Sequence, residues 1–316
     1  MNELGFSGLT NLGNTCYINS TLQILSAIKE LNDYINNNNN YNNIEDSIIT
    51  KEWKDLRYLM YNNNAIITPN RYIQINENIF KIKNIEFGQY KQCDSSEYLL
   101  FLLECIHNTY NNQSIINIDI NDKYKIFMNE YLKTDSSIIT QLFLFLYEYK
   151  YYDIENNELE ITNIDKKWCI ELSIPNKKDI TLKDCFIYNF KDETFDNNEL
   201  WFSEKKNKNI NLIKKTKIIY TSNILIIQLK RFNNKLDKNN AFIQDIEEIS
   251  LDNFSTNSTK YTLFGIINHE GNIFGGHYYS ILKRNNKWYI FNDSHIKETK
   301  VFCSDKNYCL FYRKIK

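Results

Sequence analysis

The first third of the chain has the spacing of amphipathic helices. After Cys16, apolar residues recur at intervals of three and four positions, which places them on one face of a helix. These positions are Ile18, Leu22, Leu25 and Ile28. A second stripe with the same spacing follows Asp94, and a third candidate helix covers residues 51–61. The pattern predicts that the first third of the chain is helical.

Near residue 138 the pattern changes to short runs rich in aromatic and β-branched residues, which are typical of strands. The apolar run 138–147 is short enough to be a buried strand. The further expected strands are 143–152, 168–174, 210–220, 224–229, 261–267, 277–282, 287–291 and 308–313. Polar turns separate those of the middle third, so we expect long hairpins that project from the body. Helices first and strands later predict an α+β domain with a cleft between its helical part and its sheet.

Composition and charge narrow the classes of function. Hydrophobic residues make up 42% of the 316 residues, so a buried core is expected. With 38 basic and 39 acidic residues the net charge is −1, which argues against general attraction to nucleic acid or to an anionic membrane. No apolar stretch approaches the roughly 18 residues of a membrane-spanning helix, and the N-terminal segment does not resemble a signal peptide. Seven widely spaced cysteines favour free thiols in a reducing compartment, intracellular and either cytoplasmic or nuclear.

A polar, glycine-containing loop brings Cys16 to the first turn of the first predicted helix. Unpaired N–H groups and the helix dipole stabilise a thiolate at such a position. Asn11 lies five residues earlier, where its side-chain amide could join the Cys16 N–H as a donor to an oxyanion. The alternative interpretation is that Cys16 is a small buried residue at a helix start.

A reactive cysteine needs a base, and the chain has only four histidines. His107 lies near the end of the second predicted helix, where a structural role is expected. His277 follows two glycines and opens a predicted strand, which is a rigid support for a base. After one hairpin turn, Asn292 and Asp293 end the neighbouring strand, so an amide or carboxylate can orient the imidazole of His277.

Several segments together resemble the successive motifs of the ubiquitin-specific protease family. These segments are residues 8–25, 92–99, 225–232, 269–293 and 308–312. They occur in the order of the family and extend over nearly the whole chain. The resemblance implies one catalytic domain over residues 1–316 with a papain-like fold. It also implies a helical thumb over about residues 1–135, fingers of long β-hairpins over about 136–222, and an antiparallel palm sheet over about 223–316.

The resemblance also assigns catalytic roles. Cys16 matches the nucleophile of the family, His277 the general base and Asn11 the oxyanion-hole amide. Asn292 matches the third member of the triad, and Asp293 matches an adjacent acid that can support or replace that partner. The implied reaction is hydrolysis of the isopeptide or peptide bond after the C-terminal glycine of ubiquitin.

Asp94 and Glu97 have the spacing of a helix N-cap with an acidic residue three positions later. By resemblance, the same two acids face the basic tail of ubiquitin; both roles can hold together. Gly275 and Gly276 would leave a narrow tunnel for a glycine–glycine tail.

The sequence departs from the family pattern in the fingers, where many members hold zinc with two C-x-x-C pairs. The corresponding stretches here, near 147–150 and 201–205, contain no cysteine, so we expect no metal and no other cofactor. Strand pairing and aromatic packing should hold the fingers instead, with Phe143, Phe145, Tyr147 and Tyr149 on one alternating face. The nearby acids Asp153, Glu155, Glu158 and Glu160 could meet a basic face of ubiquitin or form a solvated hairpin tip.

Four functions compete at this stage. An active deubiquitinase is favoured because all the catalytic residue types are present. A catalytically inactive ubiquitin-binding module and an isopeptidase for a related modifier remain as alternatives, whereas a zinc-ribbon scaffold is disfavoured by the missing cysteine pairs. The expected partners are ubiquitin and ubiquitinated proteins, with no nucleic acid and no membrane, and the expected state is a monomer.

Overall fold

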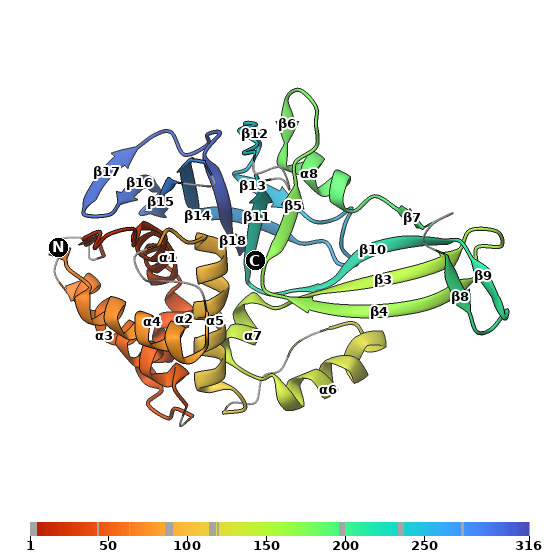
Figure 1. The fold of residues 1–316 in the computed structure, drawn as a ribbon, viewed down its shortest axis with the longest axis horizontal. Helices are drawn as coiled ribbons and strands as arrows, with labels where there is room; N and C mark the ends of the chain where they lie inside the picture. Colours follow the sequence, from red (N-terminus) through yellow and green to blue (C-terminus); the bar gives the residue numbers. More distant parts are fainter. Residues whose placement is uncertain are drawn as a thin grey trace.

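The computed structural model describes residues 5–42, 44–62, 64–85, 91–113, 118, 120–195, 200–232, 237–272 and 275–315. Its helices are α1 (Cys16–Ser26), α2 (Lys29–Asn37), α3 (Asp46–Asn62), α4 (Asn70–Ile82), α5 (Ser95–Tyr110), α6 (Lys125–Thr134), α7 (Ile138–Phe143) and α8 (Leu182–Asn189), with a 3₁₀ turn η1 (Asp122–Tyr124). Helices α1 to α5 gather at the N-terminal end of the molecule (Figure 1). Within the described residues, no helix combines the length and apolar character that crossing a bilayer would require.

The larger sheet has the strand order β17-β16-β15-β14-β18-β11-β5, and β13 pairs with β14 beside it. Its strands are β5 (Ile170–Ser173), β11 (Ile224–Lys230), β13 (Glu248–Ser250), β14 (Lys260–Gly271), β15 (Gly276–Arg284), β16 (Lys287–Asn292), β17 (His295–Thr299) and β18 (Asn307–Lys314). Neighbouring strands are antiparallel except for β5 and β11, which are parallel. The sheet contains the five strands predicted for the last third of the chain, which are β11, β14, β15, β16 and β18; β13 and β17 were not predicted.

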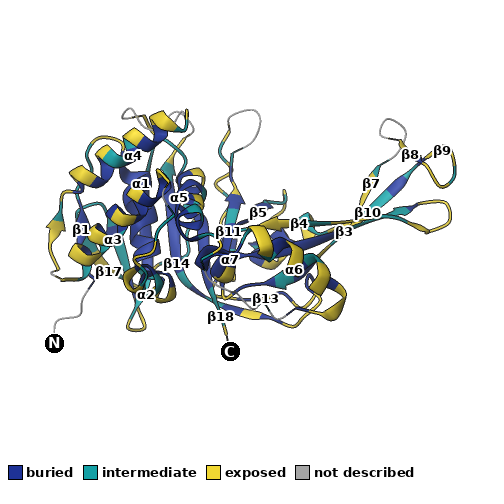
Figure 2. Cartoon of the chain, turned by 90° about the horizontal axis from the view of Figure 1, so that it is seen from below, coloured by how far each residue is buried: buried dark blue, intermediate teal, exposed yellow. Residues whose placement is uncertain are grey.

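A second sheet of four strands forms the long projection on the right of Figure 1. Its order is β4-β3-β10-β7, with β3 (Phe145–Asp153), β4 (Leu159–Lys167), β7 (Glu193–Phe195) and β10 (Leu212–Thr221). Three two-stranded pairs complete the fold: β1 (Gly8–Leu9) with β2 (Ile66–Ile67), β6 (Ile180–Thr181) with β12 (Ile243–Gln244), and β8 (Trp201–Ser203) with β9 (Lys208–Ile210). The β8–β9 hairpin lies at the far tip of the projection (Figure 2).

Helix α1 lies between the helical part and the larger sheet, and all of its residues are buried. It packs against α5 on one side and against β14, β15 and β16 on the other. One core cluster joins the helices to this face of the sheet, and a second covers the opposite face together with α8 and the base of the projection. A helix enclosed in this way holds whatever stands at its first turn in a fixed position.

Two sequence predictions for the middle third need correction. The run 138–147 does not form one strand: α7 ends at Phe143, and β3 begins at Phe145. Ser137 caps α7 by accepting hydrogen bonds from two helix N–H groups, which stabilises a helical turn in spite of β-branched residues. Phe143 therefore does not share the alternating face, whereas Phe145 and Tyr147 contact each other on β3 with ring centroids 5.0 Å apart. The other correction concerns β5, which pairs with β11 in the larger sheet instead of joining the projecting hairpins.

Candidate functional site

Cys16 is the first residue of α1 and is 3% exposed. The preceding loop turns sharply at Gly13 and Asn14, both of which have positive φ. The N-cap residue Thr15 directs its hydroxyl into the loop, where it accepts from Leu12 N–H at 2.9 Å and donates to the side-chain oxygen of residue 11 at 3.3 Å. Thr15 therefore makes no side-chain cap hydrogen bond to the first N–H groups of α1.

The imidazole of His277 lies between Cys16 and Asn292. His277 Nε2 is 2.7 Å from Asn292 Oδ1, so Nε2 carries the proton of this hydrogen bond. The other ring nitrogen is left for Cys16, whose side chain hydrogen-bonds to the imidazole. Strands β15 and β16 are antiparallel neighbours, and their pairing brings His277 and Asn292 together although they lie 15 residues apart in the sequence.

The surroundings of His277 favour its protonated form. A hydrogen bond with the Cys16 side chain is the largest cause, and the bond to Asn292 and the charge of Asp293 add to it against partial burial. Together they raise the pKa of His277 to about 9. An imidazole that keeps its proton at neutral pH beside a thiol is the arrangement expected for a thiolate–imidazolium pair.

Asp293, which follows β16 of the larger sheet, connects that sheet to the loop before α1 and to α1 itself. Its Oδ2 accepts from Asn11 Nδ2 at 3.0 Å, and its Oδ1 accepts from Asn19 Nδ2 at 2.8 Å. Its backbone carbonyl accepts from Leu9 N–H at 2.9 Å. The carboxylate lies 4.0 Å from His277 Nε2, farther than Asn292, so its main contacts are with the two asparagines.

Asn11 is held in one orientation by both ends of its amide. Its Oδ1 accepts from the N–H groups of Gly13 and Thr15 at 3.1 and 3.2 Å, while its Nδ2 donates to Asp293. An amide nitrogen carries two hydrogens, so one remains for an oxyanion beside Cys16. The predicted role of Asn11 in an oxyanion hole remains a prediction.

A groove lies between α5 and the larger sheet, and its lining includes Tyr278, the residue that follows His277. It has a volume of about 520 Å³, and its lining includes Gln92, Asp94, Glu97, Phe232, His269 and Tyr308. Asp94 caps α5 by accepting from Ser96 N–H and Glu97 N–H, as the sequence predicted, and it also accepts from Tyr308 O–H. Burial and the charge of Asp94 raise the pKa of Glu97, so a cation in this groove would stabilise both acids.

The two predicted glycines lie near Gln92, which lines this groove. A Cβ on Gly276 would lie 2.1 Å from His269 Nε2, so a side chain cannot be accommodated there. At Gly275 the nearest atom to a Cβ is Gln92 Oε1, at 3.8 Å, so the space next to this glycine is open. Gly276 N–H donates to Gln92 Oε1 at 2.6 Å, a contact that connects the two walls of the cleft.

The sequence profile of the family described as ubiquitin carboxyl-terminal hydrolase matches residues 7–312. The chain belongs to this family. Curated hydrolases of the family include Usp2 of Drosophila melanogaster, which is 26% identical over 98% of this chain and 35% of its own length. Ubiquitin carboxyl-terminal hydrolase 2 of Homo sapiens is 28% identical over 98% of this chain and 55% of its own length. The chain thus spans between about a third and about half of these curated hydrolases.

Solved structures confirm the α+β fold of this hydrolase family member. A structure of the yeast SAGA DUB module superposes with a TM-score of 0.81, 24% identity, and coverage of 100% of this chain and 70% of that one. A Ubp8 module with Sgf11, Sus1 and Sgf73, bound to monoubiquitin, gives a TM-score of 0.80 at 23% identity, covering 100% and 71%. The resemblance to ubiquitin-specific proteases stated from the motifs is therefore confirmed.

Sequence reasoning missed two polar residues of the hydrolase site. Asn19 is 2% exposed on a buried helix and lies about one turn after Cys16, and that spacing was the available signal. Gln92 connects the cleft walls through Gly276 N–H, but nothing in its local sequence indicates a partner 184 residues away.

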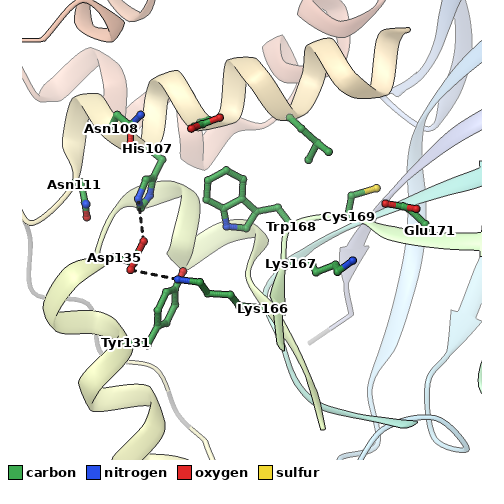
Figure 3. Close-up of a pocket in the computed structure, with 12 residues that line it drawn as sticks. His107, Asn108, Asn111, Tyr131, Asp135, Lys166, Lys167, Trp168, Cys169 and Glu171 are labelled. Atoms are coloured by element: carbon green, nitrogen blue, oxygen red, sulfur yellow. Dashed lines mark hydrogen bonds and ion pairs between the residues drawn. The ribbon is translucent and has the colours of Figure 1, made fainter. Parts of the chain in front are cut away.

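His269 and His107 do not serve as the base in this geometry. His269 is 3% exposed, and burial lowers its pKa to about 4, so it is neutral and packs beneath Gly276. His107 lines a separate cavity of about 540 Å³ between α5, α6 and the start of β5 (Figure 3). Its Nδ1 is 2.7 Å from Ser137 Oγ, and its Nε2 is 3.7 Å from Asp135. Ser137 is fully buried and caps α7, so this serine–histidine–aspartate contact is structural.

Proposed function

We propose that this chain is a cysteine-type deubiquitinase that hydrolyses the isopeptide or peptide bond after the C-terminal glycine of ubiquitin. The observation that carries the proposal is the contact of Cys16 at a helix N-terminus with a protonated His277, which Asn292 orients at 2.7 Å. The family membership and the open groove beside the pair support the same function.

Acylation begins with the Cys16 thiolate attacking the carbonyl carbon of the terminal glycine. The oxyanion that forms is stabilised by backbone N–H at the start of α1 and by the free hydrogen of the Asn11 amide. His277 then donates its proton to the leaving amine, so the C–N bond breaks and a thioester to Cys16 remains. Asn292 keeps the imidazole in the orientation and tautomer that this transfer requires.

Deacylation reverses the role of His277. Now neutral, it removes a proton from a water molecule, and the resulting hydroxide attacks the thioester. The C–S bond breaks, ubiquitin leaves with a free carboxylate, and the thiolate–imidazolium pair is restored. Asp293 acts in this scheme as a positioning residue, because its carboxylate holds Asn11 and Asn19.

The groove supports recognition of an extended, basic, glycine-ended tail. Lys230 and Arg231 also line it, but the part next to Asp94 and Glu97 carries negative charge, which favours a guanidinium or ammonium group there. The open space beside Gly275 suits a glycine–glycine end, because glycine lets two backbones approach each other closely.

Two alternatives use the same surfaces. An inactive ubiquitin-binding module would have no chemical need for the raised pKa of His277. An isopeptidase for a related modifier would catalyse the same reaction and differ only in the modifier that it binds. We also propose an intracellular site of action, cytoplasmic or nuclear, and a monomeric state, whereas the Ubp8 structure that superposes on this chain is an assembly with Sgf11, Sus1 and Sgf73.

The test is reaction with ubiquitin that carries a C-terminal electrophile, compared with related modifiers that carry the same group. A covalent adduct with the ubiquitin probe that is lost in Cys16→Ala supports the proposal. Binding of ubiquitin without an adduct identifies the inactive module and overturns it. Reaction with another modifier alone overturns the choice of ubiquitin.

A further inference from the structure

Three carboxylates lie close together at the tip of the β3–β4 hairpin. Asp153 ends β3 with a side chain 1% exposed, and Glu160 lies in β4 with a side chain 4% exposed. Glu158, in the connection between these strands, is exposed. Carboxylates that are removed from water need a cation nearby, because an unpaired buried charge is strongly destabilising.

Lys206 supplies this cation from the turn between β8 and β9. Its Nζ contacts Asp153 Oδ2, and it lies 3.1 Å from Glu158 Oε2 and 3.3 Å from Glu160 Oε1. The same Nζ donates to Asn156 Oδ1 at 3.3 Å. An ammonium group is a compact charge with three N–H donors, so one lysine can gather several oxygens around it.

The β8–β9 hairpin depends on such contacts for its position. It forms a two-stranded sheet of its own, separate from the ladder of β4, β3, β10 and β7. An isolated hairpin of two short strands is marginally stable. Ser203 Oγ donates to Glu160 Oε2 at 3.0 Å, and Lys205 Nζ donates to the Leu159 carbonyl at 3.2 Å, so side chains clustered near Lys206 connect the two hairpins.

The hairpin held in this way presents two large aromatic residues to solvent. Trp201 and Phe202 are 48% and 52% exposed, and Leu200 before them is also exposed. Figure 2 shows this tip as the end of the projection farthest from the helices. Exposed aromatic residues next to one another are typical of a surface that contacts a partner.

The zinc ion that many members of the family hold in the fingers does not fit this tip. Structural zinc needs four cysteine or histidine ligands. The chain has no cysteine between Cys105 and Cys169 or between Cys185 and Cys303. Among the described residues, no group of three or more His, Cys, Asp or Glu side chains is arranged to hold a metal ion. Where the fingertip carboxylates converge, the Lys206 ammonium stands instead.

We propose that Lys206 is a positioning residue that takes the place of a cross-linking metal and holds the β8–β9 hairpin so that Trp201 and Phe202 contact ubiquitin. The two interpretations from the sequence were that these acids bind ubiquitin or form a solvated tip. In this proposal Asp153 and Glu160 do neither, because they anchor the β8–β9 hairpin. The inference rests on the proposed function for the identity of the partner, but not for the cross-link itself.

Lys206→Met tests the proposal, because it removes the ammonium and keeps a side chain of similar length. Lys208→Met is the matched control: it removes one charge from the same hairpin, and the ion pair that it breaks is the exposed one with Glu155. We expect Lys206→Met to raise KM for a fluorogenic ubiquitin C-terminal amide at least about fivefold, with kcat within about twofold of wild type. A short peptide amide ending in Gly-Gly cannot reach the fingertip, so its hydrolysis should not change. Amide hydrogen exchange over residues 201–210 should become faster.

Lys208→Met should match wild type in every measurement, and a zinc chelator should leave the wild-type KM unchanged. Unchanged KM and unchanged hydrogen exchange in Lys206→Met would overturn the proposal, and so would a KM of wild type that rises with chelation.

If Lys206→Met does not fold, the double variant Lys206→Met/Asp153→Asn replaces it. This double variant removes a buried carboxylate together with its partner, and it should fold with faster exchange at the hairpin than wild type; exchange equal to wild type would overturn the cross-link. If wild-type protein attacks neither the ubiquitin nor the peptide substrate, the proposed function fails, while the exchange comparison still decides the role of Lys206.

Discussion

Replacing Asn292 by alanine isolates the contribution of the residue that orients the base. The substitution removes the 2.7 Å hydrogen bond to His277 Nε2. A hydrogen bond with a charged group contributes about 1.5–3 kcal/mol. His277 is 37% exposed, so solvent competes for the ring and the lower part of that range applies. At about 1.5–2 kcal/mol, kcat should fall about 10- to 30-fold in Asn292→Ala.

The pH profile gives the same prediction an independent readout. The bond to Asn292 is one cause of the raised pKa of His277, so its loss lowers that pKa from about 9. His277 must carry a proton to release the amine, so activity falls as pH rises through its pKa, and this alkaline limb should move to lower pH in Asn292→Ala. Asn292→Asp keeps a hydrogen-bond acceptor and adds a negative charge, so the alkaline limb of its activity profile should lie at the same pH as that of wild type or at a higher pH. The assay is the hydrolysis of a fluorogenic ubiquitin amide from pH 6 to 10, on variants whose thermal unfolding matches wild type. A kcat within about twofold of wild type and an unmoved limb in Asn292→Ala would refute the orienting role.

Three further predictions concern the groove and the fold. Asp94→Ala removes the cap of α5 and should lower the free energy of unfolding by about 1–2 kcal/mol in urea titrations; an unchanged unfolding midpoint would contradict this. Gly276→Ala should lower Tm because its Cβ would meet His269 at 2.1 Å, whereas Gly275→Ala should fold like wild type and raise KM for ubiquitin substrates by narrowing the groove. Equal behaviour of the two glycine variants would argue against this geometry. Since the folded-state pKa of His269 is about 4, below its ordinary value of about 6.5, the stability that its neutral form contributes is lost as pH falls through this interval. His269→Gln should show a smaller loss of Tm over that range, and an identical loss would contradict the assignment.

Elements with local signals were predictable from the sequence. The apolar stripe after Cys16 and the cap at Asp94 specify α1 and α5 within a few residues, because both signals act inside one or two helical turns. The strands of the last third were also expected near their observed bounds, since alternation and turn residues are local. The division into thumb, fingers and palm stays a prediction.

Elements that depend on contacts distant in sequence were not predictable in the same way. The run 138–147 has β-branched residues that favour a strand, but capping by Ser137 makes its first part helical. β5 is too short to specify its own neighbour, and only pairing with β11 places it in the larger sheet. No pattern in the sequence indicates the contacts of Lys206, because its partners belong to another hairpin.

The candidate site divides along the same line. Residue types and the resemblance named Cys16, His277, Asn292, Asp293 and Asn11, and the structure brings all five together. Only the geometry distinguishes the contacts of Asn292, Asp293 and Asn11: Asn292 contacts His277, whereas Asp293 binds Asn11.

The central claim is that the sulfur of Cys16 and the imidazole of His277 form one coupled pair. NMR titration of the His277 ring in wild type and in Cys16→Ala measures this coupling directly. We predict a pKa of about 9 in wild type and a fall towards the ordinary value of about 6.5 in Cys16→Ala, since the bond with Cys16 is the largest cause of the shift. The same pKa in both proteins would contradict the pair, whatever its value.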